Sequence, residues 1–285
     1  MAKVYDALRR AEEERRRRAG DEASPVAPLN IDPPPAAAKP KSARPSLWKR
    51  LFRRGKARRL EAGGAAEINK RRISIIQPDS YVAEQFRGLR GRIEAIGTER
   101  PIKTIVVSSA FAGEGKTTTA VNLAAVTGLS LGHRVLLIDC DLRRPKVHAS
   151  LGLRPQVGLA EVLRNEATVD DALMKVEGAN FDVLPVRGRP SNPSELLGSN
   201  EMKKLIDEVS QRYDRVILDS PAALGLPDAK AISNLCDGVV LVVRADFTSQ
   251  QDVESMLEML DRDRILGLML NGASVDQARY GYAAS

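Results

Sequence analysis

Short runs of β-branched and aliphatic residues recur after about residue 73, and segments with apolar residues at helical spacing separate them. Six of these runs predict buried strands, over 102–107, 133–138, 182–186, 213–219, 237–243 and 265–271. Helical spacing predicts helices over 79–97, 120–126 and 249–263. Between residues 146 and 200 we expect short helices, a single strand and a loop over 188–198. This alternation predicts an α/β fold in which helices flank a mostly parallel central sheet.

Charge and composition divide the 285 residues into three parts. The first 72 residues hold 20 Lys and Arg against nine Asp and Glu, whereas the remainder is mildly acidic. Pro and Ala dominate the stretch 20–45, which has no core-forming pattern. We therefore expect a disordered basic arm and linker over 1–72, a globular domain over 73–276 and a short tail over 277–285.

The arm contains one amphipathic stretch around Trp48, the only tryptophan. Four apolar residues, 47, 48, 51 and 52, fall on one helical face, and seven basic residues follow within residues 49–59. This pattern is typical of binding to an anionic membrane surface, with roughly 1 kcal/mol contributed per basic residue near the leaflet. A disordered basic linker or an acidic partner remains an alternative; we expect no nucleic acid.

Cysteine usage and hydropathy bear on the compartment. The two cysteines, Cys140 and Cys236, form no disulfide framework, which fits a reducing cytoplasm. The sequence has neither a signal-peptide pattern nor an apolar run of about 18 residues. We therefore expect no membrane span within the chain.

The most informative stretch joins the first predicted strand to the helix after it. Residues 108–119 read SSAFAGEGKTTT, a glycine-rich turn in the context of a phosphate-binding loop, with Ala110 in place of the usual first glycine. Gly113 and Gly115 let backbone N–H groups point at a polyphosphate, and the helix N-terminus adds partial positive charge. Lys116 is expected to reach the β- and γ-phosphates and Thr117 to ligate Mg²⁺. The predicted nucleotide-binding residues in this loop are Gly113, Glu114, Gly115, Lys116, Thr117 and Thr118.

Acidic side chains end two of the predicted strands. Asp139 and Asp141 close the run LLIDCD, and Asp219 closes the run VILD. Ligands bind at the carboxyl ends of strands in open α/β sheets, so one Asp of the first pair is expected to meet Mg²⁺ and the other to act on an attacking hydroxyl. Asp219 fits the acidic partner of a phosphate loop. Asn271 ends the last strand, where its amide either contacts a purine edge or is an ordinary turn residue.

Together these motifs carry a resemblance to a known family. The segments 113–117, 136–143 and 216–221 resemble the Walker A, Walker A′ and Walker B motifs of the bacterial tyrosine kinases, which are the cytoplasmic kinases of capsule and exopolysaccharide export. Glu84, Arg87 and Arg90, spaced to lie along one surface strip of a helix, look like that family's E-x-x-R-x-x-R oligomerisation motif. The resemblance covers about residues 73–285, and the second motif is the specific one, since ordinary P-loop enzymes lack it.

The resemblance implies an ATP-dependent tyrosine autokinase that regulates capsule or exopolysaccharide synthesis and export. It implies phosphorylation in trans, within a ring of subunits, of a C-terminal tyrosine cluster, here Tyr280 and Tyr282. The residues carried over by position as catalytic are Lys116, Asp139, Asp141 and Asp219, with Thr117, Asp139 and Asp219 as Mg²⁺ ligands. Because that family normally needs a membrane polysaccharide co-polymerase, a separate membrane partner is implied, with the chain peripheral at the inner face of the cell membrane.

Two other functions are weighed against this one. A ParA/MinD-like ATPase switch carries an extra lysine five residues before the loop lysine, and Phe111 occupies that position here. A non-enzymatic membrane scaffold would use the basic arm, but the complete set of phosphate and metal residues disfavours it. The switch ATPase is therefore the main alternative.

Overall fold

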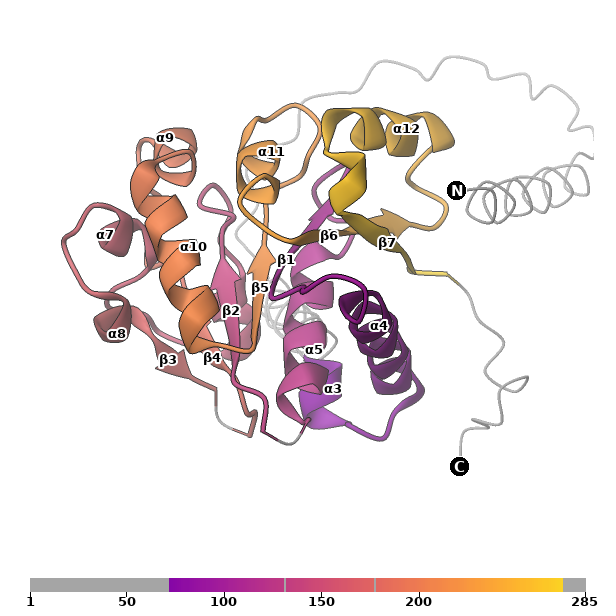
Figure 1. The fold of residues 1–285 in the computed structure, drawn as a ribbon, viewed down its shortest axis with the longest axis horizontal. Helices are drawn as coiled ribbons and strands as arrows, with labels where there is room; N and C mark the ends of the chain where they lie inside the picture. Colours follow the sequence, from indigo (N-terminus) through magenta and orange to yellow (C-terminus); the bar gives the residue numbers. More distant parts are fainter. Residues whose placement is uncertain (1–71, 131, 177, 274–285) are drawn as a thin grey trace, which may run out of the picture. The chain divides into compact units, whose positions relative to one another are not determined.

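The computed structural model describes residues 72–130, 132–176 and 178–273, shown in colour in Figure 1. Within them, seven strands form one sheet in the order β3-β4-β2-β5-β1-β6-β7. The strands are β1 (Thr104–Ser109), β2 (Val135–Asp139), β3 (Met174–Lys175), β4 (Asp182–Leu184), β5 (Arg215–Asp219), β6 (Gly238–Arg244) and β7 (Ile265–Asn271). Every neighbouring pair is parallel except β3 with β4.

Helices connect these strands and cover both faces of the sheet (Figure 1). Those before β2 are α3 (Ile73–Ile76), α4 (Tyr81–Gly97) and α5 (Lys116–Gly128). The later ones are α6 (Val147–Leu151), α7 (Leu159–Leu163), α8 (Val169–Ala172), α9 (Pro193–Leu197), α10 (Asn200–Arg212), α11 (Asp228–Ser233), α12 (Gln250–Met259) and the 3₁₀ turn η1 (Arg262–Arg264). None of the helices in the described ranges is long and apolar enough to cross a membrane.

The sheet has a hydrophobic core on each face because side chains alternate along its strands. In β2, Leu136 and Ile138 enter one core with residues of α10, α11 and α12, while Leu137 enters the other with residues of α4 and α5. The central strands are therefore buried on both faces, as expected for a parallel sheet. Because β2, β5 and β1 are adjacent and parallel, their carboxyl ends lie along one edge of the sheet.

The sequence predicted most of these elements, but it did not predict α3, α11, β3 or the position of α9. The strand predicted over 182–186 is β4, but it is not the single strand between residues 146 and 200, because β3 adds a second whose two residues are too short to show a period. The predicted loop over 188–198 contains α9, which Pro193 begins. The helix predicted over 249–263 ends at Met259, and η1 follows it.

Several predictions fall on residues outside the described ranges. They are the basic arm up to Arg71, including the amphipathic stretch at Trp48, and the tail with Tyr280 and Tyr282. These remain predictions.

Candidate active site

The loop between β1 and α5 turns sharply at two glycines. Gly113 and Gly115 adopt φ angles of 92° and 105°, in the left-handed region that favours glycine. A Cβ at position 115 would lie 2.0 Å from Nδ2 of Asn271, so any other residue there would displace the Asn271 amide. The loop leads directly into α5, which begins at Lys116.

Buried polar contacts hold this loop from behind. Glu114 is fully buried, accepting a hydrogen bond from the Phe111 amide at 2.7 Å and one from the Thr248 hydroxyl. Asn271 donates its Nδ2 to the Glu114 carbonyl at 2.8 Å. The Glu114 side chain therefore positions the loop, and its predicted share in nucleotide binding rests on its backbone.

Lys116 and Thr117 point toward the strand ends. Lys116 is only 7% exposed, and its Nζ donates to the Phe111 carbonyl at 3.4 Å. The Thr117 hydroxyl donates to Oδ2 of Asp219 at 2.6 Å. The first turn of α5 is thus joined to the end of β5 through a hydroxyl and a carboxylate.

Asp139 and Asp219 occupy the same level of neighbouring parallel strands, and both are fully buried. Burial raises the pKa of Asp219 to about 7 against an ordinary 3.8, although the Thr117 hydrogen bond and Lys116 oppose the shift. Burial, then the charge of Asp219, raises the pKa of Asp139 well above its usual range. Oδ1 of Asp219 is buried and accepts no hydrogen bond. Two paired acids and an orphaned oxygen mark a place for a cation.

Asp139 and Asp141 differ in their surroundings. Asp139 accepts backbone N–H groups from Asp141, Lys146 and Val147 at 3.0–3.2 Å, which fixes the loop after β2. Asp141 is half-buried, and its Oδ1 accepts only the Arg144 amide at 2.9 Å. Of the two carboxylates, Asp141 is therefore the one more open to a ligand.

The site fits Mg²⁺ with a nucleotide better than a metal held by protein alone. No group of three or more His, Cys, Asp or Glu suited to a metal occurs in the part of the chain that the structure describes. Mg²⁺ needs none, since it usually binds one or two carboxylates, waters and substrate phosphates. The Thr117 hydroxyl and the free Asp219 oxygen supply such ligands beside the phosphate loop.

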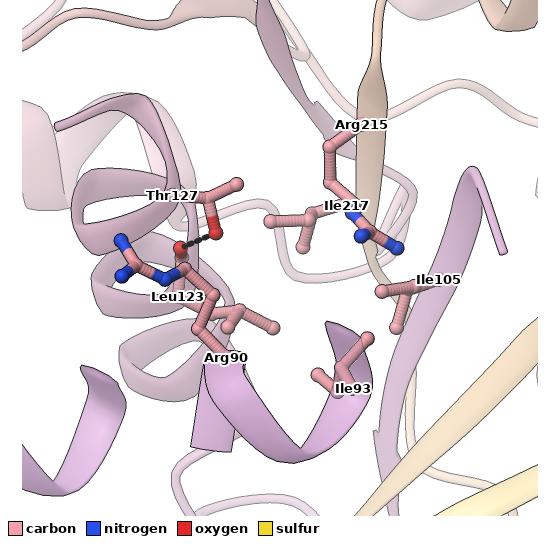
Figure 2. A pocket seen from close by; sticks show the side chains of 7 residues that line it. All are labelled: Arg90, Ile93, Ile105, Leu123, Thr127, Arg215 and Ile217. Atoms are coloured by element: carbon pink, nitrogen blue, oxygen red, sulfur yellow. Dashed lines mark hydrogen bonds between the residues drawn. The ribbon is translucent and has the colours of Figure 1, made fainter. Parts of the chain in front are cut away.

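Two sequence expectations change in the structure. The Asn271 amide tethers the phosphate loop, a contact that neither the purine reading nor the turn reading included. Arg90 lies on α4 at the predicted spacing, but its guanidinium also donates to the Val126 carbonyl and the Ser130 hydroxyl, both at 2.6 Å. Figure 2 shows it at the seam of α4, α5 and the sheet, with its guanidinium pointing away from Arg215. Glu84 and Arg87, three residues apart on α4, form an ion pair.

Sequence reasoning missed a second anchor of the loop after β2. Nε of Arg143 donates to Asp228 of α11 at 2.7 Å, and its NH2 group donates to Ser194 of α9 at 2.8 Å. The Asp228 side chain is fully buried. Arg143 lies inside the Walker A′-like segment, so its position was a signal, but its partners lie 51 and 85 residues away in sequence.

The fold and the site define a P-loop nucleotide-binding domain with an acidic residue at the end of two adjacent strands. The AAA domain family matches residues 102–264. The chain is 37% identical to the tyrosine-protein kinase YwqD of Bacillus subtilis (strain 168), over 78% of this chain and 95% of that protein. The chain belongs to the bacterial tyrosine-protein kinases.

Two further matches extend this result. The kinase domain of the Escherichia coli tyrosine kinase ETK superposes with a TM-score of 0.68 at 28% identity, covering 75% of this chain and 83% of that chain. The succinoglycan biosynthesis transport protein ExoP of Rhizobium meliloti (strain 1021) is 32% identical over 72% of this chain but only 27% of its own length. The matches to YwqD and to the ETK kinase domain confirm the predicted enzyme class and the P-loop fold.

Proposed function

We propose that this chain transfers the γ-phosphoryl group of ATP, in the presence of Mg²⁺, to Tyr280 and Tyr282 in the tail of a second copy. The observation that carries the proposal is the cluster in which Thr117 bonds to Asp219, opposite Asp139, beside the buried Lys116. This cluster joins a phosphate loop to two buried carboxylates, and one oxygen of Asp219 has no hydrogen-bond partner. The family membership supports the kinase chemistry.

The residues have distinct tasks in this reaction. The tyrosine Oη forms a bond to the γ-phosphorus as the bond to the β–γ bridging oxygen breaks, and the leaving group is ADP. Lys116 and the loop amides stabilise charge on the phosphates. Mg²⁺, when held by Thr117 and Asp219 with the phosphates, supplies positive charge to the transferring group. The hydroxyl proton passes to a carboxylate.

Asp141 is the carboxylate best placed to take that proton. Both oxygens of Asp139 already accept backbone N–H groups, and its side chain is fully buried. Asp139 therefore holds the loop after β2 and meets the metal through water. Asp141 is half-exposed on the same loop, where an acceptor hydroxyl has access.

The setting of the reaction is a polysaccharide export system. The relative ExoP is named for succinoglycan biosynthesis and transport, which supports a role in exopolysaccharide synthesis. We propose that a separate membrane co-polymerase activates the chain at the inner face of the membrane and that the basic arm contacts anionic lipid. The Glu84, Arg87 and Arg90 segment of α4 supports assembly into a ring.

The first test is mass spectrometry of the full-length protein after incubation with Mg·ATP. We expect phosphate on Tyr280 or Tyr282 in the wild type and a loss of at least about 100-fold in Lys116→Met, which removes the positive charge at the transferring phosphates. A Tyr280→Phe/Tyr282→Phe variant controls for other acceptors. Equal labelling of Lys116→Met and wild type would contradict the assigned site.

A further inference from the structure

Two phenylalanine rings beside the phosphate loop are partly exposed to solvent. Phe111 lies in the loop itself and is 37% exposed, while Phe247 follows β6 and is 54% exposed. Their centroids are 6.4 Å apart with planes at 87°, an edge-to-face contact. Large aromatic side chains gain little stability while half-exposed, so the pair needs an explanation other than core packing.

The structure fixes both rings on a rigid base. The Arg244 guanidinium lies 5.4 Å from the Phe247 centroid, and its NH1 group donates to the Gly113 carbonyl at 3.3 Å. Asp246, just before Phe247, has a φ of 58°, a conformation that non-glycine residues adopt at a cost. Thr248, just after Phe247, bonds to the buried Glu114. The loop that carries Phe247 is therefore tied to the phosphate loop on both sides of the ring.

One hydrogen bond relates Phe111 to the lysine of the phosphate loop. Lys116, the residue that reaches the β- and γ-phosphates, donates to the backbone carbonyl of Phe111. The loop amides that follow, at the start of α5, suit the α- and β-phosphates. Phe111 therefore stands beside the residue expected to contact the transferring phosphate, on the side where an acceptor must approach.

We infer that Phe111 and Phe247 form the docking site for the acceptor ring, taking a tail tyrosine from a second copy. This inference rests on the proposed function and names the residues that position its substrate. The described chain ends at Ala273, two residues after Asn271, which contacts the phosphate loop. Tyr280 is seven residues farther on, a reach of about 24 Å when extended. Each tail thus starts beside a phosphate loop and has the length to reach a docking site on a second copy packed against it.

Binding of a tail peptide tests the docking site directly. The parent is the full chain with Tyr280→Ala and Tyr282→Ala, so that its own tail does not compete, and the probe is a fluorescent peptide of residues 274–285. With Mg·ADP present, we expect Phe247→Ala and Phe111→Ala each to weaken peptide binding about tenfold, the scale of a lost aromatic contact. Phe247→Tyr keeps binding. In both alanine variants, we expect the affinity for a fluorescent ATP analogue to differ from that of the parent by less than about twofold.

Matched controls separate docking from a general effect on the surface. Leu129, 52% exposed at the end of α5, is the control position, and Leu129→Ala binds the peptide as the parent does. A peptide with both tyrosines replaced by alanine binds weakly to all variants. Unchanged peptide affinity in both phenylalanine variants, or no peptide binding by the parent, would overturn the inference. A parallel loss of ATP affinity would overturn it too, by making the rings a purine platform.

Failure of the docking site and failure of the proposed kinase reaction give different results. If the parent binds the peptide through both rings but transfers no phosphate to it, the docking site stands and the proposed acceptor chemistry fails. If transfer occurs while both alanine variants keep the wild-type KM for the peptide, the chemistry stands and the docking site fails.

Discussion

The ionised Asp219 side chain destabilises the nucleotide-free fold because it is buried opposite Asp139 and one of its oxygens has no partner. Its pKa is raised to about 7 in the fold, against 3.8 as an isolated side chain. Between these values the folded state binds more protons than the unfolded state, so stability falls as pH rises through this window. Above about pH 7 Asp219 is ionised in both states, and its full destabilising effect on the fold is present.

Asp219→Asn should therefore stabilise the metal-free protein at high pH, because it removes the charge and supplies a donor. We expect a melting temperature about 2–6 °C higher than wild type at pH 8, with the difference shrinking toward pH 5. Thermal unfolding in the presence of a chelator measures this. Asp207→Asn, at an exposed position of α10, is the matched control and should shift nothing. A pH-independent difference would contradict the buried-charge explanation.

Gly115 tests the packing of the phosphate loop. Gly115→Ala places a Cβ 2.0 Å from Asn271 in a left-handed backbone conformation, so we expect binding of a fluorescent ATP analogue to be lost. Gly132→Ala has the same backbone strain at φ 80° but open space around it, and should cost about 1 kcal/mol of stability without affecting binding. Equal nucleotide affinity in the two variants would show that the contact with Asn271 is not limiting.

For individual residues, the sequence predicted those that belong to a recognisable motif, but it did not predict the contacts between segments far apart in the chain. Lys116, Thr117 and Asp219 come together as the spacing indicated. Asn271 and Glu114 are 157 residues apart, and no local pattern signals that one holds the other. The expectation for Asn271 considered only a ligand or a turn, so it omitted the phosphate loop itself.

Among the elements, α4 and α5 share a hydrophobic core and are also joined through Arg90. Its guanidinium donates to the Val126 carbonyl and the Ser130 hydroxyl near the C-terminal end of α5, where positive charge is favourable. Glu94 on the next turn of α4 lies 3.3 Å from it. Within a subunit, Arg90 therefore ties α4 to the C-terminal end of α5.

Arg90→Ala should destabilise the fold by about 1–3 kcal/mol, the cost of unpairing a buried carbonyl and losing a charged donor. Thermal unfolding of the variant at a concentration where assembly is absent measures this. Arg92→Ala, exposed two residues farther along the same helix, provides the comparison and should change stability by less than about 0.5 kcal/mol. If the two variants melt together, the contact with α5 contributes nothing to folding.

Periodicity predicted the long elements well and the short ones poorly. The helix expected over 79–97 is α4, which begins two residues later because Ser80 caps it by accepting the Ala83 amide. The strand expected over 265–271 has those bounds. By contrast, the two residues of β3 are held by antiparallel pairing with β4, and pairing is a tertiary property that no window of sequence contains.

For the whole molecule, the α/β class and the mostly parallel sheet followed from the alternation of strands and helices, and the structure confirms both. The strand order did not follow, because which strands become neighbours depends on crossover connections rather than on any one segment. The basic arm and the tyrosine tail lie outside the described residues, so their roles are tested by experiment.

The most direct test of the central claim is the stoichiometry of phosphotyrosine formed to ADP released by the full-length protein with Mg·ATP. A kinase that uses this site yields about one tail phosphotyrosine per ADP in its first turnovers, and both products vanish together in Lys116→Met. An ATPase switch yields ADP and free phosphate with an unmodified tail. Such a result, obtained with the membrane co-polymerase present, would contradict the account.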